Sequence, residues 1–176
     1  MGEKNKIFKK DFIILERIIG IDIGLRNTGY GIIDFDQKSE KIVEGGVIKT
    51  DSKENLDERL LTIFNDLDFI YKKYSPMYSS MEDLHSRYRN LKTAIIMGHA
   101  RGVACAVSAL NNVPVYHYQP TQIKNIITGS GRADKNQMIK TVANRLDSPA
   151  ITNEHVADAF ATSICHWVMF SSIKKV

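Results

Sequence analysis

The sequence has little that would tie the protein to an oxidising or membrane environment. Its 176 residues include only two cysteines, Cys105 and Cys165, and both lie in apolar segments with helical spacing. We therefore expect reduced core residues rather than a disulfide framework. The fully apolar runs are only a few residues long, far below a membrane span, and the basic start, MGEKNKIFKKDF, lacks the apolar centre of a secretory signal. We expect an intracellular, cytoplasmic protein without membrane contact, with a phage or organellar origin as the alternative to a chromosomal one.

Glycine-rich nucleotide motifs, internal repeats and low-complexity tracts are also missing. In residues 20–24, GIDIG, Asp22 stands where a G-x-G-x-x-G motif needs its second glycine, which argues against a dinucleotide site. The composition, 43% hydrophobic and 25% charged, is that of an ordinary globular protein. We therefore predict a basic N-terminal extension at residues 1–15 and one domain at residues 16–176. The net charge of +4 and pI of about 9.0 are compatible with a polyanionic partner.

The order of apolar segments predicts an α/β fold. Strands are expected at residues 17–22, 28–35 and 41–50, and the short links between them favour an antiparallel meander. A helix beginning at a capping box of Asn55 and Glu58 follows, then strands at 77–82 and 113–118 separated by a helix at 91–111. Crossover helices imply parallel pairing, so we predict a mixed five-stranded sheet. Further helices are expected near 121–127, 134–146 and 152–170.

Acidic and imidazole side chains occur where these predicted elements begin or end. Asp22 ends the buried strand Ile18–Ile21, Glu82 ends the fourth strand, and His155 and Asp158 lie three residues apart in the last helix. That spacing places His155 and Asp158 on one helical face. If the first and fourth strands are neighbours, Asp22 and Glu82 lie side by side. The sequence therefore predicts one cluster at an edge of the sheet.

Such a cluster predicts a metal site. Carboxylates a few ångströms apart raise one another's pKa strongly, and a divalent cation removes the conflict. Oxygen ligands favour Mg²⁺ or Mn²⁺, and an imidazole also suits Mn²⁺. Two such ions form the arrangement that hydrolyses phosphodiesters. We therefore expect Asp22, Glu82, His155 and Asp158 to hold two ions of Mg²⁺ or Mn²⁺.

Each of these residues also has a purely structural interpretation. Asp22 also suits an Asx turn before Gly24, and Glu82 a solvated strand end, although neighbouring Asp83 is the better candidate for that role. His155 and Asp158 are also explained as polar residues at a helix N-terminus. The Asp22-x-Gly24 pattern also opens the fold of actin-like ATPases and sugar kinases, but these need two such domains, for which the chain is too short.

Five stretches resemble, in the same order, the RuvC family of Holliday junction resolvases. They are IGIDIGLRNTGYGII, MEDL, GHARGVACAV, PVYHYQPTQIKNIITGSGRADKNQM and HVADAFATSICH, and the resemblance covers residues 18–166. It implies a ribonuclease H-like fold and matches Asp22, Glu82 and Asp158 to the family's catalytic acids. His155 falls at the fourth position, where many members carry aspartate and some carry histidine. Ile23 replaces the family's proline.

Two basic segments are candidates for binding DNA phosphates. HSRYRNLK supplies Arg87, Tyr88, Arg89 and Lys92, and KNIITGSGRADK supplies Lys124, Arg132 and Lys135. An ordinary solvated surface and a plain turn are the alternatives. By resemblance, Lys124 and Lys135 match positions that serve DNA phosphates and catalysis. His85 stands where many members place a stacking phenylalanine, so His85 or Tyr88 is the candidate for stacking.

The resemblance implies a crossover junction endodeoxyribonuclease that cuts four-way junctions by paired symmetric nicks in DNA recombination and repair. Two equivalent cuts favour a homodimer, and the small-residue segment 98–106 is the candidate interface, with packing on the sheet as the alternative. Branch-migration motor proteins are further possible partners. The alternative functions are a nuclease of the same fold acting on flaps or forks, and a non-catalytic junction-binding protein.

Overall fold

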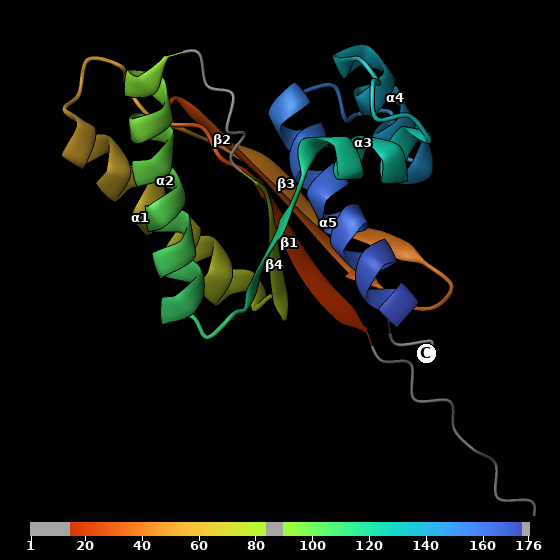
Figure 1. Ribbon diagram of the computed structural model, residues 1–176. Coiled ribbons are helices and arrows are strands. Elements are labelled where there is room, and N and C mark those ends of the chain that lie inside the picture. Colours follow the sequence, from red (N-terminus) through yellow and green to blue (C-terminus); the bar gives the residue numbers. More distant parts are fainter. Residues whose placement is uncertain (1–14, 84–89, 174–176) are drawn as a thin grey trace, which may run out of the picture.

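The computed structural model describes residues 15–83 and 90–173, which form a five-stranded sheet with helices on both faces (Figure 1). The strands are β1 (Glu16–Asp22), β2 (Asn27–Phe35), β3 (Glu40–Lys49), β4 (Tyr78–Glu82) and β5 (Val115–Tyr118). The helices are α1 (Leu56–Tyr74), α2 (Leu91–Leu110), α3 (Pro120–Thr128), α4 (Lys135–Arg145) and α5 (Glu154–Ile173). Residues 1–14, most of the predicted basic extension, lie outside the described residues.

The sheet has the predicted mixed pairing, in the order β3-β2-β1-β4-β5. β2 pairs antiparallel with both β1 and β3, whereas β4 runs parallel to β1 and to β5. Short turns allow only the antiparallel reversal, and α1 and α2 supply the crossovers that parallel strands require. The register pairs Ile21 with Met81, so Asp22 and Glu82, which follow them, end two neighbouring strands at the same edge.

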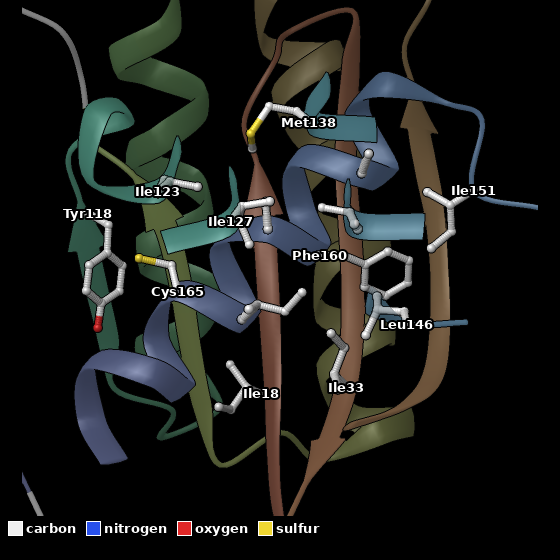
Figure 2. Close-up of a cluster of buried hydrophobic side chains, with 14 of the residues drawn as sticks. Ile18, Ile33, Tyr118, Ile123, Ile127, Met138, Leu146, Ile151, Phe160 and Cys165 are labelled. Carbon is white, nitrogen blue, oxygen red and sulfur yellow. The ribbon is translucent and has the colours of Figure 1, made fainter. Parts of the chain in front are cut away.

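The central strand β1 is buried on both faces. Ile19 and Ile21 pack with residues of α1 and α2, whereas Ile18 packs with residues of α3, α4 and α5. Figure 2 shows this second cluster, to which α5 contributes Phe160 and β2 contributes Ile33. The strand therefore carries Asp22 out of an apolar interior, and a carboxylate there has lost part of its water.

Two glycines let α5 lie very close to the sheet. A Cβ built on Gly20 would lie 1.9 Å from the carbonyl oxygen of Ala159, and one on Gly29 would lie 2.1 Å from that of His155. Larger residues at either position would push the helix away. The lack of a side chain at Gly20 and Gly29 therefore determines how closely the first turns of α5 pack on the sheet.

Helix α2 has an inner and an outer face of different character. Ala100 and Ala104 are fully buried, whereas Gly98 and Gly102 face open space. Among the described residues, α2 is the one helix long and apolar enough to cross a membrane by length and composition, and 22% of its most apolar window is buried. A single such helix is weak evidence for a membrane segment, because core helices pass the same test.

Candidate active site

Four predicted site residues meet at the edge where β1 and β4 end. Asp22 and Glu82 are the last residues of those strands, and α5 contributes His155 and Asp158 from its first turns. Nδ1 of His155 lies 2.8 Å from Oδ2 of Asp22, although 133 residues separate them in the chain. The apolar stripe of α5, including Phe160 and Ile164, points into the core instead.

The carboxylates at this edge disfavour one another's ionisation. Desolvation, followed by the charges of Asp22 and Asp158, raises the pKa of Glu82 to about 7. Desolvation and the Asp22 charge raise the pKa of Asp158 to about 6. The pKa of Asp22 is also raised, chiefly by burial, and its contact with His155 offsets part of that shift. Negative charge is therefore concentrated here without a full counter-charge from the described residues 15–83 and 90–173.

The donor set suits a divalent cation. Three carboxylates and an imidazole provide oxygen and nitrogen ligands, and a bound cation would offset the desolvation and repulsion that raise the pKa values of Glu82 and Asp158. As the side chains stand in residues 15–83 and 90–173, no group of three or more acidic, histidine or cysteine side chains is arranged to hold a metal ion. An ion bound there would compete with the contact between His155 and Asp22.

Two lysines contribute positive charge around the acidic cluster. Nζ of Lys135, at the start of α4, lies 2.7 Å from Oε2 of Glu154, and 76% of the Lys135 side chain is exposed. This pairing raises the pKa of Lys135, whose charge in turn lowers the pKa of Asp158. The charge of Lys124, in α3, likewise lowers the pKa of Glu82. Both lysines therefore act electrostatically on the edge where the carboxylates meet.

The family model described as Crossover junction endodeoxyribonuclease RuvC matches residues 18–166. The chain belongs to the RuvC family. The RuvC of Alkaliphilus oremlandii is 43% identical over 152 residues, which cover 85% of this chain and 91% of that protein. The RuvC of Rhodopirellula baltica is 41% identical over 149 residues, 84% of each chain.

The RuvC fold is also evident from a solved structure. T. thermophilus RuvC in complex with a Holliday junction substrate superposes with a TM-score of 0.83 and 27% identity, over 90% of this chain and 96% of that one. The predicted ribonuclease H-like fold is therefore confirmed.

The remaining predicted DNA-binding residues are only partly described. Lys92, at the start of α2, and Arg132, between α3 and α4, are exposed. His85, Arg87, Tyr88 and Arg89 lie outside the described residues. Gly129 adopts a left-handed conformation (φ 74°) where α3 ends, which accounts for a glycine in this turn without any ligand.

The side chains that hold the end of β4 were not among the predicted site residues. Asp83, which the sequence suggests only as a solvated residue at the strand end, accepts hydrogen bonds from Arg101 and Gln119. Arg101 lies in a helix whose notable feature in sequence was its small residues. Arg101 lies 18 residues and Gln119 lies 36 residues from Asp83 in the chain, so no local sequence pattern indicated these hydrogen bonds.

Proposed function

We propose that this member of the RuvC family is a structure-selective, metal-dependent endonuclease that resolves four-way DNA junctions by paired symmetric nicks. The observation that carries the proposal is the meeting of Asp22, Glu82, His155 and Asp158 at one sheet edge, in a chain that matches the RuvC model from residue 18 to 166. The solved relative bound to a Holliday junction supports four-way DNA as the substrate. Such a role belongs to DNA recombination and repair, inside the cell.

The acidic cluster is proposed to hold two ions of Mg²⁺ or Mn²⁺. When bound, the ions supply Lewis-acid stabilisation of the phosphate charge. Asp22 and Glu82 are the ligands from the sheet, and His155 and Asp158 are those from α5. Ligation requires ionised carboxylates, so Glu82, with a pKa of about 7, is the group whose proton competes most with the metal.

The basic residues are proposed to hold and polarise the DNA strand. The Lys135 ammonium is free to leave Glu154, because an exposed ion pair contributes little stability, and it would then stabilise charge on the phosphoryl oxygens. The residues proposed to bind backbone phosphates or stack on bases are His85, Arg87, Tyr88, Arg89, Lys92, Lys124, Arg132 and Lys135. Because these are mainly phosphate-binding side chains, junction shape rather than base sequence is the proposed basis of recognition.

A homodimer is proposed to place one active site at each of the two equivalent strands. The outer face of α2 supports this: Gly98, Gly102 and Ala106 line an open apolar groove together with Leu60 of α1. Leu91, at the start of α2, is 74% exposed. Apolar surface of this kind is typical of a protein interface. Branch-migration motor proteins are further proposed partners of the dimer.

The test is cleavage of a labelled mobile four-way junction with Mg²⁺ or Mn²⁺, beside a flap and a linear duplex. The variants are Asp22→Asn and, as a matched control, Asp68→Asn in α1. Symmetric paired nicks in the junction that are lost only in Asp22→Asn would support the proposal. Preference for the flap would retain the metal site and reject junction resolution. Tight junction binding without cleavage under either metal would identify a binding protein.

A further inference from the structure

A guanidinium from α2 holds the end of β4 at the active site. Nη1 of Arg101 donates a hydrogen bond to the backbone carbonyl of Glu82. Nη2 lies 3.3 Å from Oδ1 of Asp83 and 2.5 Å from Nδ1 of His117, which belongs to β5. One side chain thus links α2 to the ends of two neighbouring strands, directly at the proposed metal ligand Glu82.

The environment of Arg101 distinguishes it from a surface cation. Only 12% of its side chain is exposed, so its guanidinium is largely withdrawn from solvent. A buried charge of this kind is tolerated when its donors are paired, and the planar guanidinium suits several fixed acceptors at once. Burial and the Arg101 charge both lower the pKa of His117, which favours the neutral imidazole that accepts from Arg101.

Gln119, which directly follows β5, also holds the segment after Glu82. Nε2 of Gln119 donates to Oδ2 of Asp83 at 3.1 Å, and the backbone N–H of Asp83 donates to the carbonyl of Tyr118 at 2.8 Å. Asp83 is therefore held by a cation from α2, by an amide and by the strand ladder. These contacts immobilise the main chain next to Glu82, although none of them involves the Glu82 carboxylate.

We propose that Arg101 is a positioning residue for Glu82: it anchors the main chain at the end of β4 and so directs the Glu82 carboxylate toward Asp22 and Asp158. The need for an anchor is electrostatic, because the other two carboxylates repel that of Glu82 and would favour its movement away from the cluster. This inference rests on the proposed function, since it concerns the same metal site.

Two Arg101 variants and one matched control test the proposal. Arg101→Met keeps the aliphatic stem and removes both charge and donors, whereas Arg101→Lys keeps the charge and one donor group. The control is Arg17→Met. Arg17 also binds a carboxylate, that of Asp34 at 2.7 Å, and a backbone carbonyl at 2.8 Å, but it lies near the other end of β1.

The first readout is Mn²⁺ affinity of the purified protein without DNA, measured by electron paramagnetic resonance. We expect Arg101→Met to weaken it about 10- to 100-fold, as is typical when a residue supporting a metal ligand is removed. The second readout is junction cleavage at saturating DNA, where kcat falls to a similar extent while junction affinity without metal stays unchanged. Arg101→Lys recovers part of both losses. Arg17→Met lowers the melting temperature and leaves Mn²⁺ affinity unchanged.

Several results would overturn the proposal. Arg101→Met with wild-type Mn²⁺ affinity would show that Glu82 needs no such anchor, and an equal loss in Arg17→Met would show a general effect of instability. A loss confined to junction affinity would make Arg101 a DNA contact. If the wild type binds Mn²⁺ but cuts no branched DNA, the proposed function fails, and the Mn²⁺ comparison alone still decides the role of Arg101. If the wild type binds no Mn²⁺, both proposals are wrong.

Discussion

Replacing Asp158 by asparagine should stabilise the metal-free protein while weakening its response to metal. Asp158 is half-buried at the start of α5, close enough to Asp22 for their charges to repel. Asparagine has nearly the same shape and carries no charge, so the substitution removes the repulsion without leaving a cavity. The proposed metal site would then be a place where the chain gives up stability for function.

The pKa of Asp158 sets the sign and size of the effect. Its pKa rises from 3.8 in the unfolded chain to about 6 in the folded one, so the folded state binds the proton more tightly. Stability of the metal-free wild type therefore falls as the pH rises from about 4 to about 6. The full shift corresponds to about 3 kcal/mol at neutral pH, and solvent screening reduces this to about 1–2 kcal/mol. For a domain of this size that is about 3–6 °C in melting temperature.

The assay is thermal unfolding of wild type and Asp158→Asn at pH 4 and pH 7.5, in chelator and in Mn²⁺. In chelator, the melting temperature of the variant should be higher than that of wild type at pH 7.5 and nearly equal to it at pH 4. In Mn²⁺ at pH 7.5 the order should reverse, because an ion that binds only the folded state stabilises wild type more.

The matched control, Asp68→Asn, should change the melting temperature in the opposite direction. The pKa of Asp68 is lowered, mainly by hydrogen bonds from Lys72 and Asn111, so Asp68→Asn should lower the melting temperature at pH 7.5 with or without Mn²⁺. An Asp158→Asn variant that is no more stable than wild type in chelator at pH 7.5 would show that the Asp158 charge does not destabilise the metal-free protein. A difference of equal size at pH 4 would also contradict the prediction, since charge would then play no part.

Three further substitutions test the framework of the site. Gly29→Ala drives a Cβ against His155, so we expect about 1–3 kcal/mol lost in urea unfolding and weaker Mn²⁺ binding by calorimetry. Lys135→Met should slow single-turnover junction cleavage about 100-fold. Its melting temperature should not change, because the ion pair with Glu154 is exposed. Arg17→Met leaves its buried aspartate partner uncompensated and should cost about 3 kcal/mol in urea unfolding, with kcat unchanged.

Each of these three predictions has a result that contradicts it. Unchanged Mn²⁺ affinity in Gly29→Ala would mean that the first turn of α5 tolerates displacement. A lowered melting temperature in Lys135→Met would give that lysine a structural role. Slower cleavage by fully folded Arg17→Met would link the distant end of β1 to the active site.

The mixed sheet, and the meeting of Asp22, Glu82, His155 and Asp158 at one edge of it, could be predicted from the sequence because their signals are local. An apolar run that ends on a carboxylate marks Asp22 as leaving a buried strand, and the spacing of His155 and Asp158 places both on one helical face. Short links and crossover helices then decide which strands pair in which direction. Each of these inferences needs only residues that lie near one another in the chain.

The contacts that hold the site depended on the tertiary structure. Lys135 meets Glu154, and Arg101 meets the end of β4, only because α4 and α2 lie where they do. The contact of His155 with Asp22 requires α5 to lie close to the sheet, at the height set by Gly29. A sequence pattern encodes which face of an element is apolar, but the distance and register between elements emerge only when those faces pack together.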